Sequence, residues 1–303
     1  MEEIVRIRLK TTKCKREVRK VREGAKRIMK RSSVEELKAT AKEIRKDVLK
    51  MLAEAGSGHT SGSLSCVEIM VALYYYKLRH DPKNPNWPDR DRFILSKGHT
   101  CPPLYAVLAH RGFFPHEELL KLRKLGSILQ GHASLFTPGC EASTGSLGQG
   151  LSISNGIALS ARLDKKDYRV YCLLGDGEID EGQVWEAAMT AGHYKIDNLC
   201  AIVDYNKQQI DGWTSDVKNL EPIKEKWTSF GWHVIEVDGH DLKQLMDAYD
   251  ETELIKGKPS IIIAHTIKGK GVSFIEKDAI AYHGTAIKKA DLEKALKEVE
   301  EGD

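Results

Sequence analysis

Long hydrophobic runs are missing from this sequence of 303 residues. No stretch reaches the roughly 18 consecutive apolar residues that a transmembrane helix requires, so we expect no membrane-spanning segment. The lysine- and arginine-rich N-terminus is not followed by an apolar core, which argues against a secretory signal peptide. Internal repeats and low-complexity segments are also missing, and a composition of 41% hydrophobic and 30% charged residues is that of an ordinary globular protein.

Paired cysteine motifs are missing as well. The sequence contains six cysteines, none of them in a C-x-x-C pair, and several lie inside apolar segments such as residues 170–174. This pattern favours free, buried thiols over a disulfide framework or a zinc site, because both of those need cysteines at matched spacings. We therefore expect a cytoplasmic protein. The cysteines are Cys14, Cys66, Cys101, Cys140, Cys172 and Cys200.

A strong net charge is missing from the chain as a whole, but the charge is unevenly distributed. Residues 1–31 contain 13 lysines and arginines against four acidic residues, a local balance of +9, whereas the whole chain carries +3. Apolar residues alternate with basic ones over residues 5–10 and recur at helical spacing over residues 18–29, which predicts a short strand and then a basic helix. We interpret residues 1–33 as a basic extension of a single α/β domain over residues 34–303.

This basic extension leaves several partners open. A basic helix can contact RNA, an anionic membrane surface or an acidic protein. A solvated or partner-packed extension is the simpler interpretation, so we expect neither nucleic-acid binding nor membrane binding.

The body of the chain alternates between predicted strands and helices. Ser33 followed by Glu35 and Glu36 is a helix start signal, and it predicts a helix to about Ala55. Short apolar segments rich in β-branched residues then alternate with longer helical patterns, which is typical of a parallel sheet with helices on both faces. The predicted strands cover residues 92–95, 170–174, 199–204, 233–237 and 260–264, and the predicted helices cover residues 67–78, 104–108, 182–194 and 241–255.

Polar residues follow two of these strands directly. Gly175-Asp176-Gly177 comes after the strand at 170–174, and Asn206 comes after the next strand, about thirty residues later. Ligands bind at this carboxyl edge in open α/β folds, and glycines followed by a helix N-terminus favour a phosphate. Because a lone carboxylate would repel diphosphate, Asp176 is better explained as a ligand of Mg²⁺ or Ca²⁺, to which Asn206 adds a neutral oxygen.

Gly-Asp-Gly alone is common in turns. The signature of thiamine diphosphate enzymes is a longer order of features: a strand, Gly-Asp-Gly, a helix, a second strand and then Asn. The surrounding residues resemble transketolase in particular, over nearly all of residues 34–287. The blocks that carry the resemblance are Gly58-His59, Leu95 to His99, Gly131-His132, Thr144 to Gly150, Gly175 to Gly177, Ala191 to His193, Asp204 to Lys207, Thr266 to Gly271 and Tyr282 to Gly284. The resemblance implies the diphosphate-type thiamine-binding fold.

The resemblance also implies a cofactor site. Asp176, Asn206 and the main-chain carbonyl of Gln208 would ligate the metal, Mg²⁺ or, in its place, Ca²⁺ or Mn²⁺. Gly177 and His99 would contact the diphosphate of thiamine diphosphate.

Further roles implied by the resemblance concern the thiamine body and the subunit interface. Gly145 and Leu147 would contact the thiamine. Glu181 would join a carboxylate network across the interface, although an acid in the first turn of a helix also complements the helix dipole.

Three histidines are implied to face the substrate. His59 and His283 would lie near the C3 hydroxyl of a ketose, His132 would lie near the C1 hydroxyl of the two-carbon fragment, and His283 would also contact the cofactor. Histidine suits this chemistry because cleavage of a ketose beside its carbonyl removes a hydroxyl proton that the acceptor reaction later returns. His193 and His265 receive no role.

The chain ends at Asp303, whereas a complete transketolase would continue into a pyrimidine-binding domain and a C-terminal domain. We therefore expect a split enzyme that transfers a two-carbon ketol unit from a ketose phosphate to an aldose phosphate. This chain would act only with a C-terminal transketolase subunit, which would bring the glutamate that activates the aminopyrimidine ring, in a heterotetramer with two copies of each subunit.

Other functions fit parts of the same pattern. A split ketol transferase for another phosphorylated sugar is the nearest alternative. The α subunit of a 2-oxoacid dehydrogenase shares Gly-Asp-Gly and Asn but not the context of His99 and His283, and deoxyxylulose-phosphate synthase normally occupies one longer chain. A non-catalytic regulatory subunit is disfavoured because all the expected metal and histidine positions are filled.

Overall fold

The computed structural model describes residues 32–302, so the strand and basic helix predicted within residues 1–31 lie outside the described residues. The main sheet has five parallel strands in the order β1-β2-β3-β7-β6. All five correspond to strands predicted from the sequence, most of them extended by one residue. They are β1 (Arg92–Leu95), β2 (Val170–Gly175), β3 (Leu199–Tyr205), β6 (His233–Asp238) and β7 (Ser260–His265).

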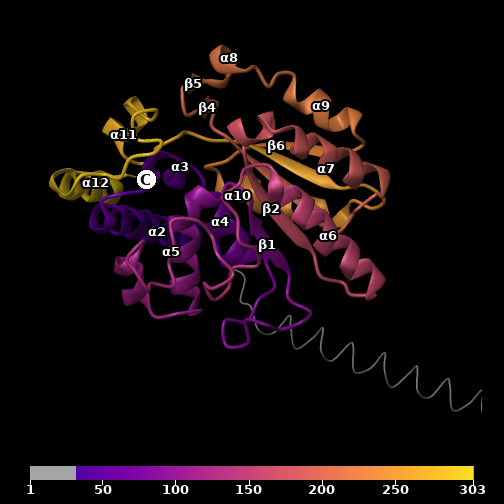
Figure 1. The fold of residues 1–303 in the computed structure, drawn as a ribbon, viewed down its shortest axis with the longest axis horizontal. Coiled ribbons are helices and arrows are strands. Elements are labelled where there is room, and N and C mark those ends of the chain that lie inside the picture. Colours follow the sequence, from indigo (N-terminus) through magenta and orange to yellow (C-terminus); the bar gives the residue numbers. More distant parts are fainter. Residues whose placement is uncertain (1–31, 303) are drawn as a thin grey trace, which may run out of the picture.

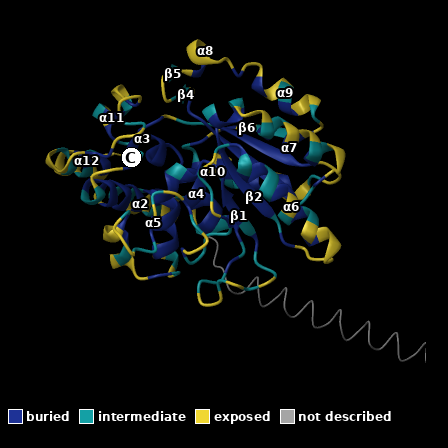
Figure 2. Ribbon diagram, viewed as in Figure 1, coloured by how far each residue is buried: buried dark blue, intermediate teal, exposed yellow. Residues whose placement is uncertain are grey.

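Alternate side chains of the strands enter two separate cores, one on each face of the sheet. On β2, Tyr171 and Leu173 belong to one core, while Cys172 and Leu174 belong to the other. The first core is closed by α2 (Val34–Ala55), α4 (Val67–Ala72), α5 (Cys101–Arg111) and α10 (Leu242–Leu254). The second is closed by α6 (Gln149–Leu163), α7 (Gly182–His193) and α9 (Ile223–Ser229). The expected parallel sheet with helices on both faces is therefore confirmed (Figures 1 and 2).

Helix α2 begins where the sequence predicts it. The Ser33 side chain accepts a hydrogen bond from the Glu36 N–H, and the Glu36 carboxylate accepts one from the Ser33 N–H, which completes a capping box. The helix ends at Gly56, whose φ of 62° is the left-handed conformation that glycine adopts without strain. One face of α2 packs on α5 and on α12 (Lys289–Glu301), and each fully buried leucine there contributes about 1.5–3 kcal/mol.

Two predicted helices differ from the structure in their detail. The helix predicted over residues 67–78 is α4 followed by one π-helical segment, η1 (Leu73–Lys77). The helix predicted over residues 104–108 begins earlier, because Pro102 and Pro103 occupy the first turn of α5, where a missing N–H costs nothing.

Helix α6 was not predicted at all. Its sequence is rich in serine and glycine, which favour turns over helix interiors, so the pattern around Gly150 suggests a loop. The small residues instead allow close packing: a Cβ at Gly150 would lie 2.4 Å from the Cβ of Ser96. Packing against β2 and α7 therefore overrides the weak local propensity.

Shorter elements complete the described chain. They are α3 (Thr60–Ser65), η2 (Gly98–Thr100), η3 (His116–Lys121), η4 (Gly177–Asp180), the hairpin of β4 (Gln208–Gln209) and β5 (Gly212–Trp213), α8 (Thr214–Val217) and α11 (Ser273–Lys277). No helix within residues 32–302 is both long enough and apolar enough to span a membrane.

Candidate functional site

Asp176 and Asn206, which were singled out in the sequence, lie at the carboxyl edge of the sheet together with two lysines that were not. Lys97 follows β1, Asp176 follows β2, Asn206 follows β3 and Lys268 follows β7. Because the four strands are parallel neighbours, their carboxyl ends lie side by side. The predicted position of the site is thus explained by the topology.

Asp204, near the end of β3, is the buried charge around which this edge is organised. The Lys97 ammonium and the Thr266 hydroxyl donate hydrogen bonds to its carboxylate. The Ser65 hydroxyl donates a further one to Oδ2, at a distance of 2.6 Å. Burial raises the pKa of Asp204, but the Lys97 charge and these hydrogen bonds outweigh it and hold the pKa below its ordinary value. Asp204 therefore remains a carboxylate that fixes Lys97 in place.

Asp176 lies beside this pair and is itself almost fully buried. Its Oδ1 accepts from the Gly177 N–H at 2.8 Å and its Oδ2 from the Lys207 N–H at 2.5 Å. Burial and the neighbouring Asp204 charge raise the pKa of Asp176 to about 7. Asn206 joins the same turn, because its Oδ1 accepts from the Gln208 N–H at 3.2 Å. The three residues predicted to ligate a metal are thus brought together.

Lys268 places a buried cation at the same edge. Its Nζ lies 3.3 Å from the carbonyl oxygen of Gln208 and 2.8 Å from Nδ1 of His283, and its residue is only 3% exposed. Burial lowers its pKa to about 8. Among residues 32–302, both of its hydrogen-bond partners are neutral. A buried ammonium without a bonded anion is costly, so this position suits an anionic ligand.

Four predicted histidines surround the space beside these cations. The ring centroids of His59 and His99 are 4.8 Å apart, those of His59 and His283 are 5.8 Å apart, and those of His59 and His132 are 6.3 Å apart. His59 is the N-cap of α3, His99 lies in η2, and His132 and His283 lie in loops. Residues far apart in sequence therefore converge as expected.

The environment keeps these imidazoles uncharged. Burial, with added repulsion from Arg123, lowers the pKa of His59 to about 4, and burial with the Lys268 charge lowers that of His283 to about 3. Burial also lowers the pKa of His132, and it brings that of His99 well below its usual range. Neutral imidazoles at neutral pH are able to accept a proton.

The loop that leads into α6 closes another side of the site. Gly145 has a φ of 151°, and a Cβ there would lie 3.0 Å from the His132 ring, so only glycine fits without displacing that histidine. Leu147 is half-buried in the same loop. Glu181 is exposed at the N-cap of α7, where its Cβ lies beside Gly148.

Several residues of the site were missed by the sequence reasoning. Lys97 and Lys268 lie inside the blocks that resemble transketolase, yet neither was given a role. Glu178 was also missed: its buried carboxylate accepts from the Ser96 hydroxyl, from the Gly148 N–H at 2.9 Å and from the Gly175 N–H at 3.0 Å. Glu178 therefore joins three of the loops that build the site.

A second buried charge group holds the loop that carries Lys268. Glu68 forms an ion pair with Arg45 at 2.5 Å and contacts Nδ1 of His240 at 2.9 Å. Nε2 of His240 accepts from the Ile267 N–H at 2.8 Å, and the Arg45 Nε–H donates to the Lys270 carbonyl at 3.0 Å. The group fixes both flanks of Lys268.

These residues fit a metal-bound diphosphate. A carboxylate, an amide oxygen and a carbonyl oxygen are the donors that hard divalent cations prefer. The buried Lys268 ammonium, whose hydrogen-bond partners among residues 32–302 are neutral, is matched to a negatively charged ligand. His59 Nδ1 is buried without a hydrogen-bond partner among residues 32–302, which leaves it available to a ligand.

The comparisons with known proteins agree with this chemistry. Residues 37–300 match the family model described as transketolase, thiamine diphosphate binding domain. A 6-deoxy-6-sulfo-D-fructose transketolase subunit from Clostridium sp. (strain MSTE9) is 46% identical over 88% of this chain and 96% of that protein. One of the apulose-4-phosphate transketolase subunits, from Phocaeicola vulgatus, is 42% identical over 88% of this chain and 95% of that protein.

Solved structures give the same assignment. Transketolase from Campylobacter jejuni superposes with a TM-score of 0.83 at 33% identity, over 89% of this chain but 43% of that one. Transketolase from Pichia stipitis gives a TM-score of 0.81 at 36% identity, with 40% of its chain covered. The chain thus spans about two fifths of the length of the solved transketolases that it matches. The chain belongs to the transketolase family, as its thiamine diphosphate binding domain.

Proposed function

We propose that this chain is the diphosphate-binding subunit of a two-chain transketolase, which transfers a two-carbon ketol unit between sugars. The observation that carries the proposal is the buried Lys268 ammonium, whose hydrogen-bond partners within the described residues are neutral and which faces the Asp176 region. An anionic diphosphate would give this cation its missing partner. The near-complete coverage of two relatives that are named as transketolase subunits supports the division into two chains.

Mg²⁺ is the metal we propose, with Ca²⁺ or Mn²⁺ as substitutes. Asp176, Asn206 and the Gln208 carbonyl would hold it, because Asn206 and Gln208 lie in the turn after β3 and the Asp176 carboxylate, which follows β2, is hydrogen-bonded to the same turn. A bound dication would also keep Asp176 ionised, against the burial that raises its pKa to about 7. Gly177 and His99 would contact the diphosphate.

The remaining cofactor contacts follow the resemblance. Gly145 and Leu147 would contact the thiamine, and Glu181, exposed in the described chain, would join the interface between subunits. When bound, thiamine diphosphate stabilises the carbanion that is left when a carbon–carbon bond beside a carbonyl breaks.

The histidines of this chain would move the proton that accompanies this cleavage. His59 or His283 would accept the single proton of the C3 hydroxyl, and the other ring would lie beside that hydroxyl, since the low pKa of each leaves it neutral and the two rings are neighbours. His132, the most exposed of the group, would bind the C1 hydroxyl of the two-carbon fragment. In the acceptor reaction the same histidines would return the proton.

We propose an anionic ketose as the donor and an aldose phosphate as the acceptor. A ketose phosphate is the expected donor, but one relative is named for a sulfonated ketose and another for apulose 4-phosphate. These sugars share a terminal anion, so the anion type rather than the transfer chemistry would differ between them.

The proposed partner is a C-terminal transketolase subunit that binds the pyrimidine half of the cofactor, in a heterotetramer of two copies of each. A cytoplasmic location is proposed because the five cysteines within residues 32–302 are free and four of them are buried. Residues 1–31 remain predicted as a basic extension without nucleic-acid or membrane binding.

The test is a reconstitution. The purified chain, with thiamine diphosphate and Mg²⁺, would be assayed for ketol transfer alone and with a candidate C-terminal subunit, using fructose 6-phosphate, 6-deoxy-6-sulfo-D-fructose and apulose 4-phosphate as donors. We expect activity only with both chains, and none with Asp176→Ala, which should also lose metal-dependent cofactor binding. Full activity of the chain alone would refute the two-chain proposal, and unchanged cofactor binding by Asp176→Ala would refute the metal site.

A further inference from the structure

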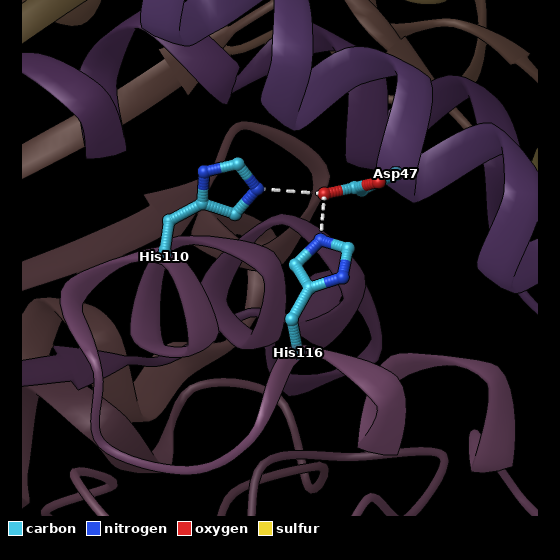
Figure 3. A group of neighbouring side chains, drawn as sticks. All are labelled: Asp47, His110 and His116. Atoms are coloured by element: carbon cyan, nitrogen blue, oxygen red, sulfur yellow. Dashed lines mark hydrogen bonds and ion pairs between the residues drawn. The ribbon is translucent and has the colours of Figure 1, made fainter.

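A second group of histidines lies away from the cofactor site. His110 on α5 and His116 at the start of η3 both point toward Asp47 on α2 (Figure 3). Nε2 of each histidine lies 2.7 Å from the same carboxylate oxygen, Oδ2 of Asp47. Three residues from three separate elements therefore direct their donor atoms at one point.

The donor set of this group is that of a transition-metal site. The three ligand atoms all lie within 4.8 Å of one another. Two imidazoles and one carboxylate suit Zn²⁺ and its neighbours in the first transition series, whereas Mg²⁺ and Ca²⁺ prefer oxygen donors alone. We infer that Asp47, His110 and His116 bind a transition-metal dication of the Zn²⁺ type, with water completing the coordination.

Little movement is needed to admit the ion. Ligands about 2.1 Å from a tetrahedral zinc ion are roughly 3.4 Å apart, so each ring would withdraw from Asp47 by less than about 1 Å. The Asp47 side chain is 9% exposed and fixed on α2, while that of His116 is 57% exposed, which leaves one side open for the ion and for water. The protons now held at Nε2 would shift to Nδ1, because the metal binds the nitrogen lone pair.

One neighbouring charge opposes the ion. Lys50 Nζ lies 3.9 Å from Oδ1 of Asp47, but this side chain is 47% exposed and can turn toward solvent. Its contact is long and lies on the other carboxylate oxygen, so it leaves Oδ2 available to the metal.

The site is spatially separate from the cofactor site. His110 lies in the last turn of α5, and His99 precedes the first turn of that helix. At a rise of about 1.5 Å per residue the two histidines are roughly 15 Å apart along the axis. A bound ion would therefore link α2, α5 and η3 without touching the catalytic residues, and its binding does not depend on the proposed function.

The test is a Zn²⁺ titration of the reduced full chain with thiamine diphosphate and excess Mg²⁺ present to fill the oxygen-lined site. Wild type, His110→Gln, His116→Gln and the control His233→Gln would be compared by calorimetry. The control is matched because His233 is also a surface histidine paired with one carboxylate, Glu251. We expect wild type and control to bind one Zn²⁺ per chain. The Zn²⁺ affinity of His110→Gln and of His116→Gln should be lower than that of wild type by a factor of about ten or more.

Thermal unfolding supplies a second readout. Zn²⁺ should raise the midpoint of wild type and control, because a ligand that binds only the folded state stabilises it, and should raise that of His116→Gln much less. His116 is exposed, so its replacement leaves folding intact, which circular dichroism without metal would verify. Absence of Zn²⁺ binding by the wild type, or equal binding by all four proteins, would overturn the inference and leave a hydrogen-bonded cluster only.

Discussion

The two histidine groups lie at opposite ends of α5, and their neighbours differ in charge. At the carboxyl edge of the sheet, the rings of His59, His99 and His283 crowd one another beside the cations Lys97 and Lys268. At the far end of the helix, His110 and His116 share the single carboxylate of Asp47. Histidine side chains thus lie beside cations at one end of α5 and beside an anion at the other end.

These surroundings give the two groups of histidines different chemical properties. Burial and nearby cations lower the pKa of His59 to about 4, which keeps a neutral imidazole ready to accept a proton. In the other group, burial raises the pKa of Asp47, but hydrogen bonds from the two histidines outweigh it and lower the pKa below its ordinary value. The carboxylate there stays charged, and its histidines are held as donors or ligands.

His59→Gln should give the largest effect, because it removes a group that we propose as an acceptor of the substrate proton. We expect kcat of the proposed two-chain enzyme to fall about 10²- to 10⁴-fold, with cofactor affinity nearly unchanged. Steady-state kinetics and a cofactor titration measure the two quantities. His233→Gln is the matched control and should keep wild-type values; a kcat for His59→Gln near that of the control would break the distinction between the two groups.

Lys268→Met should weaken cofactor binding and stabilise the chain at the same time. Loss of a charge-assisted hydrogen bond to phosphate predicts about 10- to 100-fold lower affinity for thiamine diphosphate. Replacing a buried cation by an apolar side chain of similar length predicts a gain of about 1 kcal/mol in the unfolding free energy of the cofactor-free chain. Calorimetry and urea unfolding measure the two effects.

The control for Lys268→Met is Lys297→Met, since the Lys297 side chain is 73% exposed on α12. It should change neither quantity by more than about 0.5 kcal/mol. If Lys268→Met binds the cofactor as well as this control does, then Lys268 does not bind the diphosphate. The buried Lys268 ammonium would then no longer support the proposed function.

His240→Asn should have a smaller effect that separates positioning from catalysis. The asparagine can still donate to Glu68 but no longer accepts from the Ile267 N–H, so the loop that carries Lys268 loses one anchor. One net hydrogen bond of about 0.5–1.5 kcal/mol predicts roughly two- to tenfold weaker cofactor affinity, with kcat unchanged at saturation. A reduced kcat at saturating cofactor would show that His240 does more than position the loop.

The sequence predicted what depends on local pattern and on topology. Apolar, β-branched segments identified all five strands of the main sheet, and parallel topology then placed Asp176 and Asn206 at one edge. Helix α6 escaped prediction because its serines and glycines favour turns, and only packing against β2 and α7 makes it helical. Local pattern therefore indicates where a site lies, and packing decides which loops build it.

The charged partners escaped prediction for a related reason. Neither Lys268 nor Glu178 is distinguished by local pattern, and each acquires a role only when it is buried against distant loops. Asp47 and His110 are likewise 63 residues apart and meet only through the packing of α2 on α5. A spacing rule within one segment cannot detect such a group, whereas the Gly-Asp-Gly motif is local and was detected.

The smallest expected effect concerns the pH dependence of stability, and it distinguishes the two histidine groups without substrate. The pKa of His283 is lowered to about 3 in the folded chain from an ordinary value near 6.5, so the unfolded chain binds more protons between these limits. Stability must therefore fall as pH drops from about 6.5, and His283→Gln should flatten this decline by about 1 kcal/mol after allowance for solvent screening. Urea unfolding of the metal- and cofactor-free chain at pH 7 and at pH 5 measures it.

His116→Gln is the matched comparison for this measurement. Asp47 titrates below its ordinary value near 3.9, so a change at its histidine partner should lower stability by a similar amount at pH 7 and at pH 5, without altering the slope between them. Equal slopes for His283→Gln and wild type would mean that His283 is not held neutral by burial and Lys268. In that case the histidines at the two ends of α5 would not differ in their tendency to ionise. The proposed proton acceptance at the carboxyl edge could then not be explained by the nearby cations.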